Sequence, residues 1–315
     1  SERHTQLAEL LQVTKIGIWG GHLWEQISLP IYLRKQKNPP LLNFVNTGPI
    51  SYENQITVIH DLSFVRYPAS FSKQFCFYYS KIIPRIIARS KKIITVSKFT
   101  RDEIIKIFGV HKNKIAVVYN FLSEKLLRLS KEDYGNENKY GDYVLTVSSL
   151  NPRKNLKRIL QAFNLAKLKN AKLLIVGENR RIFRREDLSQ HLNDNVIFTG
   201  FVEDEELVRL YKNAKLFLYP SLYEGFGIPP IEAMLCGCPV IVSNVSSMPE
   251  ICGDAAFYVN PLDPNEIKDA VLEVYHNKDL RENLVRKGLK VVNQFNFDRS
   301  LKALYDEAKL FVRGS

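Results

Sequence analysis

The sequence predicts an α/β protein of two domains, each with a parallel sheet covered by helices. Its 315 residues exceed the usual size of one domain and suggest two of roughly 150 residues each. Short β-branched runs alternate with amphipathic stretches such as 155–167 and 204–213, and this alternation is typical of doubly wound sheets. A polar break at 123–141, rich in Gly and Asn near its end, predicts the domain boundary.

Eight apolar runs have the length and composition of buried parallel strands. They are Ile56–Ile59, Ile93–Val96, Ile115–Val118, Tyr143–Val147, Leu173–Val176, Val196–Phe198, Leu216–Tyr219 and Val240–Val242. The last segment, 262–315, has an almost continuous helical pattern. We therefore expect an N-terminal domain over 1–135, a C-terminal domain over 136–290, and a terminal helix over 291–315 that folds back on the first domain.

Positive charge is concentrated in the first part of the chain. The formal net charge is +12, and residues 1–140 hold 21 Lys and Arg against 11 Asp and Glu. A basic half implies an anionic partner such as phosphate, nucleic acid or an acidic membrane surface. A merely solvated basic surface explains the charge equally well. A nucleic-acid partner would rest on charge alone, because no nucleic-acid-binding motif is present.

The remaining composition predicts a cytoplasmic protein. No run of 18 or more apolar residues exists, and the polar first ten residues carry no signal region. The four cysteines lack metal-ligand spacing, so we expect them to be reduced, small core residues. No metal site is expected.

The segment 219–234 combines the end of a strand, a Gly-containing loop and the start of a helix near Pro229. Loop glycines let backbone N–H groups approach a ligand, and a helix N-terminus suits phosphate. Glu224 and Glu232 could bracket a sugar nucleotide, since carboxylates accept from sugar hydroxyls. Alternatively, Glu232 only complements the helix dipole.

The run Glu224–Glu232, with seven residues between its glutamates, resembles the hallmark of glycosyltransferase family 4, retaining enzymes with the GT-B fold of two Rossmann-like domains. The runs 233–241, 249–251 and 253–256 are also similar to that family. The resemblance extends from about Trp24 to the C-terminus and is specific in the C-terminal half. Within that family, the sequence resembles bacterial mannosyl- and rhamnosyl-type transferases of surface polysaccharide synthesis.

This resemblance implies roles for the residues of the loop and helix. Glu232 would bind the ribose hydroxyls of the donor. The donor sugar would be held by Glu224 and the backbone of Gly225, Phe226, Gly227 and Ile228. Val202, which follows the strand 196–198, matches a region where the family seats the base.

Arg153 and Lys154 follow the strand 143–147 and open a helix. Two adjacent cations there suit a diphosphate, with Lys as a point charge and Arg as a bidentate fork. A solvated basic pair is the alternative. In the family the matching Lys contacts the diphosphate, where negative charge develops on the leaving group. The family generally needs no metal for this step, and no cofactor is expected beyond the nucleoside-diphosphate sugar itself.

His60 and Asp61 directly follow the strand 56–59. A lone histidine at a strand end is more often a structural hydrogen-bonding group. The resemblance instead implies that His60 contacts the donor sugar from the N-terminal domain, with Asp61 orienting it. Ser97 is a weaker site candidate, because it is better explained as the N-cap of a helix over 99–107.

The segment Phe71–Lys92 mixes aromatic and basic residues. One interpretation is peripheral contact with an anionic membrane at its inner face. The other is a core helix with a solvated basic face.

Taken together, the motifs imply transfer of a hexose or deoxyhexose from a nucleoside-diphosphate sugar to a glycan or lipid-linked glycan, with retention of configuration and no nucleic-acid partner. Only 59 residues precede His60, and no counterpart of the family's first strand and Gly-rich acceptor loop is found. The N-terminal domain is therefore expected to be incomplete. The alternative function is a non-catalytic or partner-dependent module that binds nucleotide or glycan.

Overall fold

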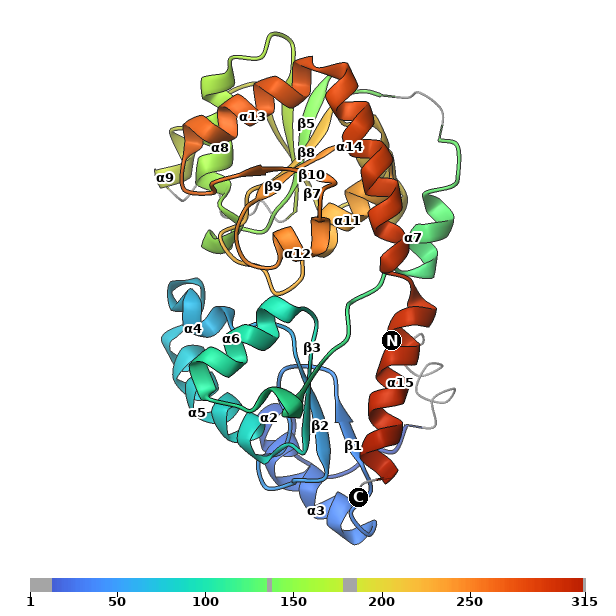
Figure 1. Cartoon of the computed structure of the whole chain (residues 1–315). Helices are drawn as coiled ribbons and strands as arrows, with labels where there is room; N and C mark the ends of the chain where they lie inside the picture. Colours follow the sequence, from blue (N-terminus) through green and yellow to red (C-terminus); the bar gives the residue numbers. More distant parts are fainter. Residues whose placement is uncertain (1–12, 135–137, 178–185, 314–315) are drawn as a thin grey trace.

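The computed structural model describes residues 13–134, 138–177 and 186–313, and these form two α/β domains (Figure 1). Each domain contains a sheet in which every pair of neighbouring strands is parallel. The N-terminal sheet has the order β1 (Leu41–Asn43), β2 (Gln55–Ile59), β3 (Lys92–Thr95), β4 (Ile115–Val117). The C-terminal sheet has the order β10 (Ala256–Val259), β9 (Val240–Ser243), β8 (Leu216–Tyr219), β5 (Tyr143–Val147), β6 (Lys172–Val176), β7 (Val196–Gly200). The predicted fold class is confirmed.

All eight predicted strands are present, with ends that differ from the prediction by two residues at most. The strands β1 and β10 were not predicted. Both lie at the edge of a sheet, where one partner suffices. β1 has only three residues, each half-buried, so its sequence lacks the long apolar run that marks a buried strand.

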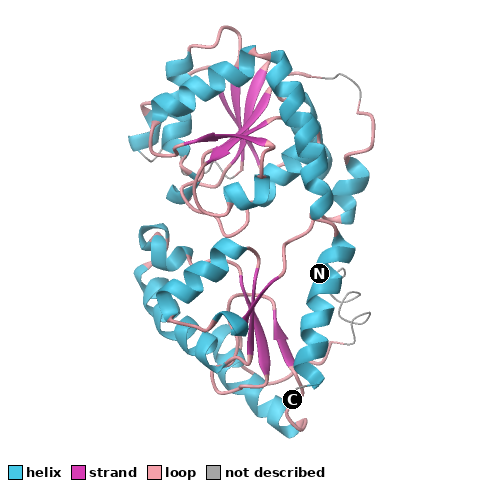
Figure 2. Ribbon diagram, viewed as in Figure 1, coloured by secondary structure: helices cyan, strands magenta, loops and turns pink. Residues whose placement is uncertain are grey.

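Helices cover both faces of each sheet (Figure 2). Those before the first crossing between the domains are α2 (Gly21–Leu23), α3 (Leu29–Lys35), α4 (Ser63–Arg66), α5 (Lys73–Arg89) and α6 (Lys98–Phe108). Those that follow it are α7 (Glu124–Leu129), α8 (Leu156–Ala166), α9 (Glu186–Ser189), α10 (Asp204–Asn213), α11 (Ile228–Leu235), α12 (Met248–Cys252), α13 (Pro264–His276), α14 (Lys278–Val291) and α15 (Phe297–Arg313).

In the C-terminal sheet, successive strand residues pack into two different cores. Val144 and Leu216 belong to the cluster formed with α8 and α13. Leu145 and Phe217 belong to the cluster formed with α10 and α11. Side chains of a strand alternate between the two faces, so strands covered on both sides must be apolar at every position.

The N-terminal sheet is covered on one face by α5 and α6 and on the other by the terminal helix α15. Ile93 packs with isoleucines of α5 and with Ile104 of α6. On the other face, α15 is tied to the start of β3 by an ion pair between Lys92 Nζ and Glu307 Oε2 at 3.1 Å. Figure 1 shows α15 running along the N-terminal domain, although it follows the C-terminal domain in sequence.

Helix α5 carries most of the basic and aromatic segment, and its two sides differ. Ile82, Ile83, Ile86 and Ile87 are buried against the sheet. The opposite side exposes Lys73, Phe77, Lys81 and Arg85, spaced four residues apart on one stripe. The helix is therefore a core helix, and membrane contact through its outer stripe stays a prediction.

The chain crosses twice between the domains, and the two crossings lie side by side. The backbone N–H of Leu122 donates to the carbonyl of Phe295 at 3.0 Å. The rings of Phe121 and Phe297 meet edge to face, with centroids 5.0 Å apart. These contacts join the segment after β4 to the segment between α14 and α15, and so form a double connection between the domains.

All four cysteines are free thiols. Cys236, Cys238 and Cys252 are buried, as expected for core residues. The expected core position was wrong for Cys76, which is half-buried on α5 with its Sγ donating to the carbonyl of Pro68 at 3.4 Å. Within the described ranges, no helix combines the length and apolar character needed to cross a bilayer. The polar first ten residues lie outside those ranges.

Replacing Ile86 with Ala should lower the free energy of unfolding by roughly 2 to 5 kcal/mol, because the side chain is fully buried and a cavity would remain. Chemical denaturation measures this loss. Phe77→Ala is the matched control, since Phe77 is 69% exposed on the same helix and its loss should change stability little. Comparable losses in both variants would contradict the assignment of faces. Weaker binding of Phe77→Ala to anionic lipid vesicles would support membrane contact, and unchanged binding would argue against it.

Candidate functional site

The strand order places two loops side by side at the centre of the C-terminal sheet. β5 and β8 are neighbours, and the chain winds outward from them in opposite directions. Open α/β sheets bind ligands at such a switch point, beyond the carboxyl ends of the strands. The loop after β5 carries Arg153 and Lys154, and the loop after β8 carries Glu224. The two strongest sequence signals therefore meet in space.

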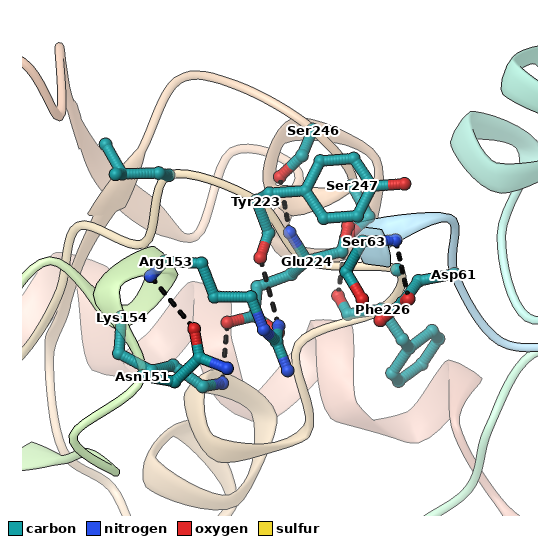
Figure 3. Close-up of polar contacts among 12 residues, drawn as sticks. Asp61, Ser63, Asn151, Arg153, Lys154, Tyr223, Glu224, Phe226, Ser246 and Ser247 are labelled. Carbon is teal, nitrogen blue, oxygen red and sulfur yellow. Dashed lines mark hydrogen bonds and ion pairs between the residues drawn. The ribbon is translucent and has the colours of Figure 1, made fainter. Parts of the chain in front are cut away.

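Arg153, Lys154, Glu224 and Tyr219 form one ionic cluster. Figure 3 shows Arg153, Lys154 and Glu224 of this cluster. Lys154 Nζ lies 2.6 Å from Glu224 Oε1, and Arg153 Nη1 lies 3.0 Å from Glu224 Oε2. The hydroxyl of Tyr219 donates to Glu224 Oε1 at 2.9 Å and accepts from Lys154 Nζ. Glu224 is only 6% exposed, so its carboxylate is satisfied almost wholly by these neighbours.

The cluster has more positive than negative charge. Burial alone would raise the pKa of Glu224, but the charges of Lys154 and Arg153 outweigh it and hold that pKa below its usual value. Burial lowers the pKa of Lys154, and the neighbouring Arg153 charge adds to this effect. Arg153 Nε is buried without a partner among the described residues. Two cations that share one carboxylate, with one donor unused, can accept a further anion.

The loop after β5 is shaped by two asparagines. Asn151 Oδ1 accepts from the backbone N–H of Arg153 at 3.1 Å and starts the 3₁₀ turn Pro152–Lys154. Asn155 ends that turn with a φ of 62°, and its Nδ2 donates to the carbonyls of Pro220 and Pro261. Because Asn tolerates the left-handed conformation, it can reverse the chain here while tying the turn to the loop after β8.

The loop after β8 is held by two serines at the start of α12. Ser247 Oγ lies 3.0 Å from the carbonyl of Glu224 and 2.8 Å from that of Phe226. Ser246 Oγ accepts from the backbone N–H of Glu224 at 3.2 Å. Gly227 then enters α11 with a φ of 98°, a conformation that favours glycine. Ile228, the first residue of α11, is 40% exposed.

Gly225 lies directly against the N-terminal domain. A Cβ at this position would collide with the carbonyl of His60, so only glycine permits this approach. The imidazole of His60 donates from Nε2 to the carbonyl of Phe44 at 2.6 Å. The backbone carbonyl of His60 therefore lies directly against the loop.

The structure gives Asp61 a backbone partner, and its role in orienting His60 stays a prediction. Asp61 Oδ1 accepts from the backbone N–H of Ser63 at 2.9 Å, at the first residue of α4. The free N–H groups of a first helical turn attract such a carboxylate. The charge of Asp61 does act on Arg153 and Lys154, so the structure brings Asp61 near the ionic cluster.

Glu232 and Val202 lie outside the ionic cluster. Glu232 is half-buried on α11 and accepts from the hydroxyl of Tyr211 at 3.2 Å. Burial raises the pKa of the Glu232 carboxyl. It is the fifth residue of α11, beyond the first turn where a helix dipole acts strongly, so dipole complementation explains it poorly. Val202 is half-buried and packs on the main core cluster.

Several site residues had no predicted role. Tyr219 is the last residue of β8. Its polar group at the carboxyl end of a buried strand could have marked it as a site residue from the sequence. Ser246 and Ser247 act through backbone carbonyl and N–H groups that no sequence motif reveals. Across the described residues, no group of three or more His, Cys, Asp and Glu side chains could hold a metal ion.

Replacing Glu224 with Gln should leave two buried cations without their carboxylate and cost about 3 kcal/mol of stability. Inorganic pyrophosphate should then raise the melting temperature more in the variant than in the parent chain, because no internal carboxylate competes for the cations. Thermal denaturation with and without pyrophosphate measures both effects. Glu282→Gln, which removes an exposed carboxylate from α14, is the control. Equal stabilisation of the parent chain and the Glu224 variant would show that Glu224 does not compete with an anion.

Comparison with known proteins agrees with this arrangement. Residues 130–291 match the family model of glycosyl transferases group 1, and residues 23–125 match that of glycosyltransferase family 4. The chain is 31% identical over 284 residues to the O-antigen chain mannosyltransferase B of Escherichia coli, covering 85% of this chain and 74% of that protein. It is 31% identical over 223 residues to the O-antigen chain mannosyltransferase RfbU of Salmonella typhimurium, covering 70% of this chain and 61% of that protein.

Solved structures show the same fold. The Anabaena protein HepE, solved in complex with UDP and glucose, superposes with a TM-score of 0.72 at 18% identity, covering 97% of this chain and 88% of that one. WaaG, a glycosyltransferase involved in lipopolysaccharide biosynthesis, superposes with a TM-score of 0.71 at 16% identity, covering 87% and 79%. The two-domain GT-B fold and both family matches establish that this chain belongs to the family 4 glycosyltransferases.

Proposed function

We propose that this glycosyltransferase moves mannose, or a similar hexose or deoxyhexose, from a nucleoside-diphosphate sugar to a glycan or lipid-linked glycan. The mannosyl donor is suggested by the relatives, which are O-antigen mannosyltransferases. A nucleoside diphosphate is suggested by the HepE complexes with UDP. The donor, its base and the acceptor are proposals, since the relatives are 31% identical and extend beyond the matched region.

The observation that carries the proposal is the ionic cluster at the switch point. Arg153 and Lys154 are largely shielded from water, share the single carboxylate of Glu224, and leave Arg153 Nε unused. A diphosphate supplies several acceptor oxygens and more than one negative charge. It would therefore neutralise the pair better than Glu224 does.

Diphosphate binding would also release Glu224. Once the two cations turn to the phosphates, the Glu224 carboxylate becomes free to accept from hydroxyls of the donor sugar. Sugar recognition and diphosphate recognition would then be coupled, because one cannot be completed without the other. Tyr219 is hydrogen-bonded to both Lys154 and Glu224, and it would stay in place while the cations turn from Glu224 to the phosphates.

The other predicted donor contacts fit around this centre. Glu232 would accept from the ribose hydroxyls, and Val202 would line the seat of the base. The backbone of Gly225–Ile228, held by Ser247, would face the sugar. His60 would reach the sugar from the N-terminal domain once its ring leaves the carbonyl of Phe44.

The proposed reaction follows the retaining course of the family. The bond between the anomeric carbon and the diphosphate oxygen breaks, and the acceptor oxygen bonds to the same face of that carbon. The acceptor proton passes to the leaving phosphate. Arg153 and Lys154 would stabilise the charge that develops on the diphosphate. A lipid-linked acceptor would suit the basic outer stripe of α5, which could meet an anionic membrane surface.

Replacing Lys154 with Ala should weaken transition-state stabilisation by roughly 2–4 kcal/mol, since a preorganised charge at the leaving group is lost. Turnover of a panel of nucleoside-diphosphate hexoses, followed by release of the nucleoside diphosphate, measures the effect. Lys157→Ala, an exposed lysine on α8, is the matched control and should behave like the parent chain. Unchanged turnover and donor affinity in Lys154→Ala would refute the role of the ionic cluster. Tight nucleotide binding by the parent chain without any transfer would instead favour the binding-module alternative.

Replacing Glu232 with Gln should weaken nucleotide binding by about 1–3 kcal/mol, because a charged acceptor of ribose hydroxyls is lost. Calorimetry with a nucleoside diphosphate and its 2′,3′-dideoxy analogue separates the causes. The loss should be smaller for the dideoxy analogue, which has no ribose hydroxyls to donate. Equal losses for the two nucleotides would show that Glu232 acts elsewhere.

A further inference from the structure

Helix α6 of the N-terminal domain is capped by a side chain from the C-terminal domain. Glu250, the third residue of α12, accepts from the backbone N–H of Lys98 at 2.7 Å and from that of Phe99 at 2.9 Å. Lys98 and Phe99 are the first two residues of α6, whose N–H groups have no partner within the helix. The third N–H, that of Thr100, is taken by Ser97 of the same domain.

The environment of Glu250 suits a carboxylate. The positive end of the α6 dipole points at it, and Arg101 on the same first turn adds positive charge. The hydroxyl of Tyr119, which follows β4, donates to Glu250 Oε1 at 2.9 Å. Burial and this carboxylate raise the pKa of Tyr119 to about 12, so the phenol stays a donor at neutral pH. All three donors belong to the N-terminal domain, whereas Glu250 belongs to the C-terminal one.

The same turn of α6 also touches the donor-side loop. Ser97 Oγ donates to the carbonyl of Gly225 at 2.6 Å, and Thr100 Oγ1 donates to the carbonyl of His60 at 3.2 Å. Gly225 in turn lies against His60. The first turn of α6 therefore fixes the relative position of the Gly225 loop and His60, and it is itself held in place by Glu250.

We propose that Glu250 is a positioning residue that docks the two domains by capping α6, and thereby sets His60 against the Gly225 loop. It would act through α6 rather than by touching the donor. Helix caps contribute modest free energies, so the contact can open and close while the double connection at Leu122 and Phe295 keeps the domains joined. Such a latch would open to let substrates enter and products leave, and would close to the same docked geometry each time.

Glu250→Gln tests the latch, because the amide keeps the shape of the side chain but replaces one acceptor oxygen with a donor. Hydrogen exchange in peptides that cover 97–108 should become faster, with peptides from the C-terminal sheet unchanged. Small-angle scattering should show a larger maximum dimension as the docked population falls. Tyr119→Phe, which removes one of the three hydrogen bonds, should give a smaller change of the same kind. Glu282→Gln is again the control for loss of charge alone.

The kinetic arm rests on the proposed function. With a donor that the parent chain turns over, kcat of Glu250→Gln should fall about tenfold, as expected for loss of hydrogen bonds to a charged group. Affinity for a free nucleoside diphosphate should stay within about twofold, since Glu250 does not belong to the ionic cluster; a purely structural defect would lower both. The inference would be overturned if Glu250→Gln left hydrogen exchange at 97–108 unchanged. It would also be overturned if hydrogen exchange there became faster while kcat stayed the same. Exchange and scattering need no donor, so they decide the docking role even if Lys154→Ala refutes the proposed function.

Discussion

Two cations that share one buried carboxylate are the constraint around which the C-terminal domain is arranged. Arg153 and Lys154 come from the loop after β5, and Glu224 comes from the loop after β8. Neither loop could hold its charges in a site so poorly hydrated without the other, because a buried charge left unpaired is costly. The six-stranded order makes β5 and β8 neighbours, and this topology brings the charges within hydrogen-bond reach.

The cluster is suited to exchanging its internal carboxylate for an incoming anion. Arg153 and Lys154 share hydrogen bonds to the one carboxylate of Glu224, and Arg153 Nε is a buried guanidinium nitrogen without a partner in the described structure. A network in which every donor had a hydrogen-bond partner would be more stable, but it would offer no free donor to a further anion. The backbone around it is rigid by contrast, since Ser246, Ser247 and Asn155 fix both loops through hydrogen bonds to the main chain.

The contact between the domains follows from the same loop. Gly225, next to Glu224 in the chain, approaches the His60 carbonyl too closely for any side chain, and α6 closes over this point with Glu250 as its cap. The ionic cluster and the domain contact are therefore mechanically linked through one short segment. The paired crossings at Leu122 and Phe295, together with α15 along the N-terminal sheet, keep the domains attached whether or not this contact is made.

The sequence by itself determined the elements and the chemistry of the site. Strands buried on both faces are apolar throughout, so runs such as Leu216–Tyr219 could be recognised from composition alone. Residues at the ends of such strands, including Lys154 and Glu224, could be selected because parallel sheets bind ligands there. The short edge strand β1 could not be found in this way, since three half-buried residues carry no clear pattern.

Only the tertiary structure decided which charges pair and which groups cross between the domains. The sequence suggested Asp61 as a partner of His60, and the tertiary structure shows its Oδ1 accepting from the N–H of Ser63 at the start of a helix. Lys154, Tyr219 and Glu224 form one cluster because strand order, not sequence distance, sets their separation. Glu250 lies 152 residues from the helix end that it caps, and no local pattern encodes such a contact. The periodicity of apolar residues in a segment indicates which of its side chains are buried, so it can be read from the sequence. Long-range polar pairing depends on where the folded chain brings each donor and acceptor, so only the tertiary structure decides it.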